Sequence, residues 1–184
     1  MHLQVATDHQ RNIISTTLGF TGAAGDALVQ RHAEWERQPQ LHFSHLEHLL
    51  GDKGMHRTAH VVCPYKGEAA KTTENVNFNF QLARLRVIAE HVIGLLKGRW
   101  ESLRKLRTQI AGEKDFKLAM AWIIACCVLH NICDACGDAD EEVAPEASPE
   151  QEDTMAAGLG AKESRERVKR DALAIMRATG EYEC

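Results

Sequence analysis

The chain has 184 residues, of which 44% are hydrophobic, and its formal net charge is −4. This length suits one domain with a tail, and the apolar fraction is sufficient for a buried core. No uninterrupted apolar run reaches the ~18 residues of a membrane-spanning helix, and the N-terminus lacks the pattern of a signal peptide, so we expect no membrane partner.

The charge is distributed unevenly along the chain. Residues 138–153 hold eight acidic side chains and no basic one, so the rest of the chain carries a net charge of +4. We therefore expect a mildly basic folded part with an acidic segment attached. The six cysteines, with Cys126 and Cys127 adjacent, favour a reduced, intracellular protein over a disulfide scaffold.

The first half of the chain favours short strands. Residues 2–7 and 12–18 read as two strands of a hairpin, joined by a polar turn that contains Asp8. A Gly-rich loop follows, and Asp26 stands where a side chain would cap a helix over residues 27–36.

Two further short strands are expected at residues 46–50 and 61–65. The first ends in Gly51-Asp52-Lys53-Gly54, and the second is stopped by Pro64. Residues 66–79 read as a loop. Strands followed by helices indicate an α/β fold.

Helical spacing dominates the second half. Apolar residues recur at the period of a helix over residues 80–98 and again over 115–134. Residues 137–160 have a composition typical of disorder. A last helix is predicted at 162–178.

Two acidic residues have the setting of metal ligands. Asp52 follows an apolar strand, and Glu90 lies within the long helix, on a stripe that borders its apolar face together with Arg86 and Lys97. Carboxylates on such elements can bind Mg²⁺ or Mn²⁺, which prefer oxygen ligands. The alternative is that Glu90 is a surface acid paired with Arg86 at i−4.

Several separate motifs, in the right order, resemble the PIF/Harbinger group of DDE transposases. Residues 51–55 resemble the family's gly-asp-ser-gly-tyr segment, residues 62–66 its leu-thr-pro-tyr-lys strand, and residues 77–79 its short Asn motif. Residues 84–100 look like the helix that bears the catalytic glutamate, and residues 125–131 are similar to the closing cys-x-x-leu-his-asn helix.

The resemblance implies an RNase-H-like, DDE integrase-type fold in which three acids hold two Mg²⁺ ions. By motif, Asp52 is the second acid and Glu90 the third. The first acid belongs to an asp-gly-thr-his strand that this sequence does not contain. Asp8 lies in the hairpin turn, and Asp26 matches a family position that is not one of the three acids.

We therefore expect an N-terminally truncated DDE endonuclease-like domain at residues 1–136, with its first strand missing. An acidic linker at 137–160 and a C-terminal helix or tail at 161–184 follow.

DNA is the expected partner. Basic side chains near the catalytic helix could contact its phosphates. The candidates are Arg86, Lys97, Arg99, Arg104 and Lys105. A solvated helix face is the alternative. In this family a separate partner protein often reads the DNA sequence, and the expected location is the nucleus.

A zinc site is a competing interpretation for the Cys and His residues. Cys126, His130 and Cys133 lie at i, i+4 and i+7 on one predicted helix, with Cys136 nearby. That spacing is unlike structural zinc sites, so packing thiols and a hydrogen-bonded histidine are favoured.

Two functions follow from these observations. The first is a metal-dependent DNA endonuclease, weakened or inactive because one acid is absent. The second is a catalytically dead transposon remnant or domesticated binding module that contacts DNA or protein.

Overall fold

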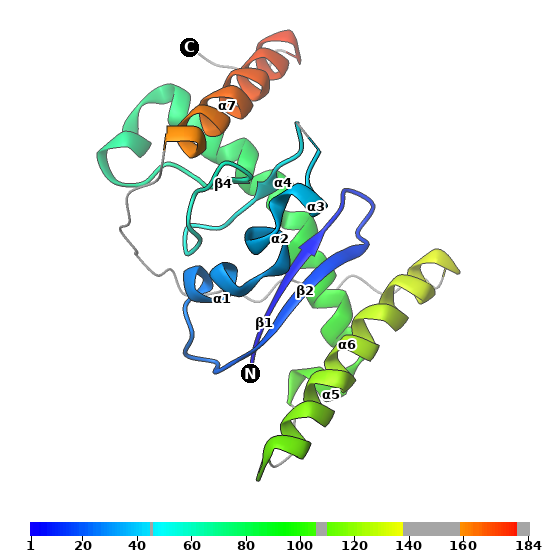
Figure 1. Ribbon diagram of the computed structural model, residues 1–184. Coiled ribbons are helices and arrows are strands. Elements are labelled where there is room, and N and C mark those ends of the chain that lie inside the picture. Colours follow the sequence, from blue (N-terminus) through cyan, green and yellow to red (C-terminus); the bar gives the residue numbers. More distant parts are fainter. Residues whose placement is uncertain (45, 106–109, 138–158, 180–184) are drawn as a thin grey trace. The chain divides into compact units, whose positions relative to one another are not determined.

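A computed structural model describes residues 1–44, 46–105, 110–137 and 159–179. The chain divides into two compact units. Unit 1 comprises Met1–Ala24 and Val87–Ser148, and unit 2 comprises Gly25–Arg86 and Pro149–Cys184. Figure 1 shows the elements, coloured along the sequence.

Unit 1 begins with the predicted hairpin. Strand β1 (His2–Thr7) pairs antiparallel with β2 (Ile13–Phe20). In the turn, the Asp8 carboxylate accepts hydrogen bonds from the backbone N–H of Gln10 (2.8 Å) and of Asn12 (2.9 Å). Asp8 therefore holds the turn, as its position predicted.

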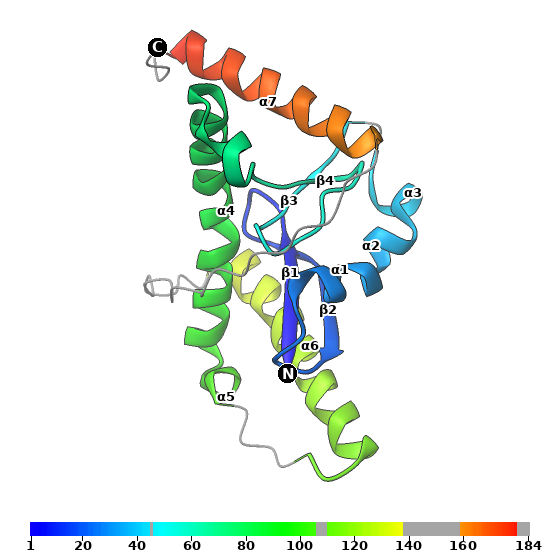
Figure 2. The ribbon, with the colours of Figure 1, turned by 90° about the vertical axis from the view of Figure 1, so that its left-hand side faces the viewer.

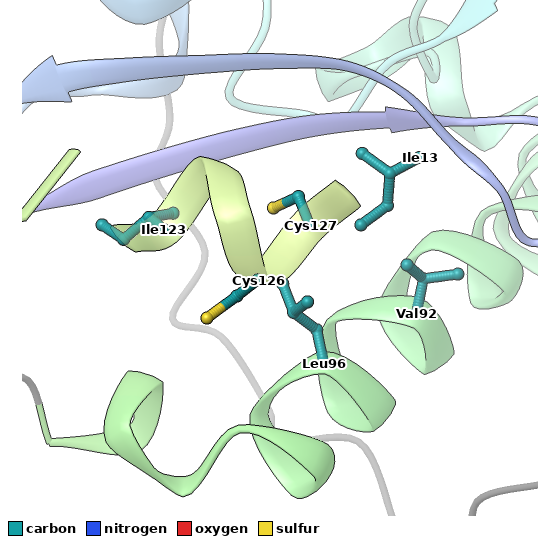
Figure 3. Packing of buried hydrophobic residues seen from close by; sticks show 6 residues of the cluster. All are labelled: Ile13, Val92, Leu96, Ile123, Cys126 and Cys127. Atoms are coloured by element: carbon teal, nitrogen blue, oxygen red, sulfur yellow. The ribbon is translucent and has the colours of Figure 1, made fainter. Parts of the chain in front are cut away.

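A long apolar helix covers this hairpin. Helix α6 (Glu113–Ala135) packs on β2, together with the last turns of α4 (Thr73–Arg99), and the short helix α5 (Glu101–Arg104) follows α4. Figure 3 shows the six buried side chains of this core, which are Ile13, Val92, Leu96, Ile123, Cys126 and Cys127.

Among the described residues, α6 is by length and composition long and apolar enough to cross a membrane. The same length and composition are found in core helices of soluble proteins.

Unit 2 starts with three short helices. They are α1 (Asp26–His32), α2 (Glu34–Arg37) and α3 (Pro39–His42). The prediction of one helix over residues 27–36 was wrong, because Ala33 adopts an extended conformation and separates α1 from α2. The capping role of Asp26 was also wrong, since the N-cap is Gly25 and no side chain makes a capping hydrogen bond.

Two short strands then form a parallel pair. Strand β3 (Leu49–Leu50) lies beside β4 (Val61–Val62), with Leu49 opposite Val61. Both residues of β4 are fully buried. Val61 belongs to one hydrophobic core, with Trp35 and Cys63. Val62 belongs to a second core, with Tyr65 and Phe78.

The segment between β4 and the long helix differs from the expected loop. A 3₁₀ helix, η1 (Gly67–Lys71), is followed at once by α4, which begins at Thr73 and not near residue 80. The Thr72 hydroxyl accepts a hydrogen bond from the Asn75 backbone N–H (3.4 Å), a helix-starting contact that the polar composition concealed. Burial of Phe78 then secures the added turns.

Helix α7 (Leu159–Thr179) completes unit 2. It lies beside the first turns of α4 (Figure 2), where Val168 and Ala172 pack against the core that holds Phe78 and Leu82. The predicted last helix is thus confirmed, and it packs on its unit.

The described elements form a mixed α/β structure with small sheets and many helices, which confirms the predicted class. The RNase-H-like arrangement, the missing first strand and the domain limits at residues 136 and 160 stay predictions. Most of the expected linker lies outside the described residues.

Candidate active site

The turn after β3 carries Asp52. Its entry is fixed by Gly51, whose backbone N–H donates to the Val62 carbonyl oxygen (2.8 Å). A Cβ atom at Gly51 would lie 2.9 Å from Cγ1 of Val61 and 3.0 Å from Sγ of Cys63. Glycine is therefore needed here because the chain passes directly against β4.

At the end of the same turn, Gly54 lies close to a second acidic residue, Asp26. A Cβ atom at Gly54 would lie 2.6 Å from Oδ2 of Asp26. The absence of a side chain at Gly54 thus makes room for the Asp26 carboxylate, at the start of α1. Each glycine of the Gly-Asp-x-Gly motif is therefore required by a different close contact.

The Asp52 carboxylate is partly exposed and already has two partners. Its Oδ1 atom lies 3.0 Å from Nη1 of Arg86 and accepts the backbone N–H of Lys53 at 2.5 Å. The side chain of Asp52 is 44% exposed and that of Arg86 is 24% exposed. A half-open carboxylate beside a guanidinium can bind a cation only in competition with that guanidinium.

Glu90 belongs to the part of α4 in unit 1, whereas Asp52 belongs to unit 2. Glu90 is exposed in the structure, although its helical position predicted the edge of the core. Among the described residues, no group of three or more His, Cys, Asp or Glu side chains is arranged to hold a metal ion.

The basic candidates have different surroundings. Arg86 contacts Asp52, and Lys97 is half-buried. Arg99 donates to the carbonyl oxygen of His130 (3.2 Å), and its Nη1 lies 3.2 Å from the ring Nδ1. Arg104 and Lys105 are exposed. Arg99 thus has a structural role in unit 1, while Arg104 and Lys105 are accessible to solvent.

His130 and its neighbouring thiols form part of the core. His130 is fully buried, and Cys126 is 1% exposed. Burial raises the pKa of Cys126, and it raises the pKa of Cys127 to about 11. These buried side chains agree with the favoured interpretation of packing thiols and a hydrogen-bonded histidine.

Two asparagines of the recognised motifs bind the backbone of a distant residue in the same way. The Asn131 amide accepts the Ile13 backbone N–H (2.9 Å) and donates to the Ile13 carbonyl oxygen (2.9 Å). Asn79 does the same for Tyr65, at 2.8 Å and 3.0 Å. The motifs marked these residues, but spacing alone did not indicate their partners.

Contacts between α7 and Tyr65 were missed by sequence reasoning. The Tyr65 hydroxyl donates to the Glu166 carboxylate, and the Arg165 guanidinium lies 3.6 Å from the centre of the Tyr65 ring. Burial, followed by the hydrogen bond to Glu166, raises the pKa of Tyr65 to about 12. The apolar stripe of the last helix was the one available signal that this helix would pack.

The chain matches the model of the DDE superfamily endonuclease family over residues 1–131. That range is well over half of the 184 residues, and the chain belongs to this family. Neither a comparison with curated proteins nor one with solved structures found a match.

Proposed function

We propose that this chain is a transposase-derived DDE endonuclease domain of the PIF/Harbinger kind, with an RNase-H-like arrangement. Asp52 and Glu90 would hold Mg²⁺ or Mn²⁺, and the substrate would be a phosphodiester of nuclear DNA. Family membership supports the nuclease class. The motifs at residues 51–55, 62–66 and 84–100 support the subtype.

One observation supports the assignment of Asp52. Within unit 2, Asp52 contacts Arg86 of helix α4 at 3.0 Å. Residues 84–100 of this helix resemble the segment that bears the family's catalytic glutamate. Asp52 therefore pairs with a residue of the motif helix, and the assignment of Glu90 rests on the motif.

The donor atoms fit the expected ion. Carboxylate oxygens are the ligands that Mg²⁺ and Mn²⁺ prefer, and such ions keep several waters. When bound, the metal would activate a water molecule and stabilise the leaving oxygen of the phosphodiester. Asp52 and Glu90 would orient the ion, and Arg86 would balance the charge of Asp52 in its absence.

Two acids form a weaker site than three. The printed sequence supplies no counterpart of the first acid that the resemblance implies. We therefore expect weak metal binding and little or no nuclease activity from this chain alone.

The test is calorimetric titration of the purified chain with Mn²⁺ and with Mg²⁺. The variants are Asp52→Asn and Glu90→Gln, which keep shape and remove charge. Glu101→Gln, at an exposed acid of α5, is the matched control. Loss of binding in both variants, with binding kept in the control, supports the shared site. Binding that is indifferent to both changes contradicts it.

A catalytically dead binding module is the second candidate. The Arg86–Asp52 ion pair favours it, because the guanidinium already neutralises one acid. DNA binding in the presence of a chelator, unchanged by Asp52→Asn, with no metal uptake in calorimetry, would establish this function.

A further inference from the structure

Helix α7 lies outside residues 1–131, the range that matches the family, yet it brings basic side chains to Tyr65. The Arg165 guanidinium lies 3.6 Å from the centre of the Tyr65 ring, and the Lys169 ammonium lies 5.4 Å from it. Lys169 also pairs with Glu74 at 3.0 Å, which balances its charge. Arg165 is therefore the cation of α7 that is best placed to bind an anion.

A guanidinium stacked on an aromatic ring keeps its edge for hydrogen bonds. The Nε atom of Arg165 is buried and has no hydrogen-bond partner among the described residues. Such a buried donor carries a cost until an acceptor reaches it. The Nε–H group of Arg165 therefore needs a hydrogen-bond acceptor.

Arg57 also has a buried hydrogen-bond donor without an acceptor. It lies between the Asp52 turn and β4, and its Nε atom is also buried without a partner within the described part of the chain. Geometry brings the two segments together: α7 contacts β4, and a Cβ atom at Gly160 of α7 would lie 3.8 Å from Cβ of Ala59, two residues after Arg57. In agreement with this, burial, and then the charge of Arg57, lower the pKa of Arg165. Two neighbouring cations with unused donors fit an anion between them.

The nearby acids have hydrogen-bond or ion-pair partners of their own. Glu166 accepts the Tyr65 hydroxyl, although its charge also acts on Arg165, and Asp52 contacts Arg86. The charges of Lys66, Arg165, Asp52 and Arg57 all act on the thiol of Cys63. Three of these four charges are positive.

We propose that Arg57 and Arg165 together bind a phosphate group of the DNA backbone, with α7 supplying half of the site. Guanidinium forks bind phosphate oxygens in pairs, which suits two adjacent arginines. The choice of DNA as the source of the phosphate rests on the proposed nuclease function. The site itself rests on unit 2 alone.

The first arm of the test uses inorganic phosphate as the probe. Thermal unfolding of the full chain is compared in phosphate and in chloride at equal ionic strength. We expect phosphate to raise the Tm of the unmodified chain, and Arg57→Gln and Arg165→Gln to abolish that rise. Arg170→Gln, at an exposed arginine of α7, should keep it.

The behaviour in chloride separates a binding role from a structural one. Arg57→Gln relieves repulsion, so its Tm in chloride should equal or exceed that of the unmodified chain. If Arg165→Gln fails to fold, Arg165→Lys replaces it in the test. This variant keeps the positive charge but lacks the paired N–H donors of the guanidinium group, so its phosphate response should also be weaker. An unchanged phosphate response in Arg57→Gln, or a Tm in chloride that falls in this variant, overturns the proposal.

The second arm uses fluorescence anisotropy with a labelled DNA duplex across salt concentrations. Each variant of the pair should weaken binding and reduce the slope of log K against log salt by about one. A lost phosphate response with an unchanged DNA slope would overturn DNA as the source. If calorimetry finds no metal binding at Asp52 and Glu90, the phosphate and DNA measurements can still support the Arg57–Arg165 site. The two proposals can therefore be contradicted separately.

Discussion

The side-chain amide of Asn79 donates to the carbonyl oxygen of Tyr65 and accepts its backbone N–H, at 3.0 Å and 2.8 Å. One side chain on α4 thereby satisfies both backbone groups of a buried residue that follows β4. The contact fixes the position of the Tyr65 ring, on which α7 packs.

Replacement of Asn79 should destabilise the chain strongly. Asn79→Ala leaves two backbone groups without a partner, and we expect a loss of about 2–4 kcal/mol in the free energy of unfolding. Urea denaturation measures it. Asn77→Ala is the control, because the Nδ2 atom of Asn77 has no partner among the described residues. Equal losses in both variants would contradict the role of Asn79.

Gly54 should be intolerant of a methyl group while Asp26 is present. In Gly54→Ala the new Cβ would meet Oδ2 of Asp26 at 2.6 Å, and forced overpacking costs about 1–3 kcal/mol. The cost should shrink in an Asp26→Ala background, which a double-mutant cycle measures. Gly112→Ala is the control, as nothing lies within 4 Å of that site. Additive losses would refute the steric contact.

The cysteines should differ in reactivity. Burial raises the pKa of Cys63 to about 12 and that of Cys127 to about 11, whereas Cys136 is exposed. Because the thiolate is the nucleophile, a thiol reagent at neutral pH should label Cys136 first and the buried pair slowly. Mass spectrometry locates the label, and denatured chain provides full labelling for reference. Rapid labelling of Cys63 in the folded chain would disprove the buried environment.

Alkaline pH should weaken the docking of α7. The pKa of Tyr65 in the fold is raised to about 12 by burial and by Glu166, above the ordinary value of about 10. The folded state therefore favours the protonated hydroxyl. This contribution is fully present below about pH 10 and is lost as the pH rises toward 12.

Tyrosinate absorbance and helical circular dichroism, followed together, measure this transition. Tyr65→Phe should remove the late tyrosinate step and flatten the dependence of stability on pH in that window. A tyrosinate step that finishes near pH 10 in the unmodified chain would refute the buried hydroxyl.

Sequence patterns predicted the secondary structure correctly where one local conformational preference dominated. The hairpin around Asp8, the apolar helix α6 and the amphipathic helix α7 were all predicted close to their observed bounds. Each has a clear period or turn signal that its packing does not overrule.

Local patterns failed where the deciding contact came from elsewhere. The start of α4 depended on Thr72 and on the burial of Phe78, and the break at Ala33 has no local signal such as proline. For the candidate site, the motif singled out Asp52, while its ion pair with Arg86 required the fold. The assignments of Asp52 and Glu90 as metal ligands rest on the motifs and stay predictions.

Helix α6 has no charged residue from Leu118 to Cys133, and its outer side exposes large side chains such as Leu118, Trp122 and Val128. Water is a poor solvent for such a surface. The isolated chain will therefore be least soluble when concentrated, and it will adhere to hydrophobic matrices. Calorimetry and anisotropy on this protein should accordingly be run dilute, with light scattering recorded on the same samples.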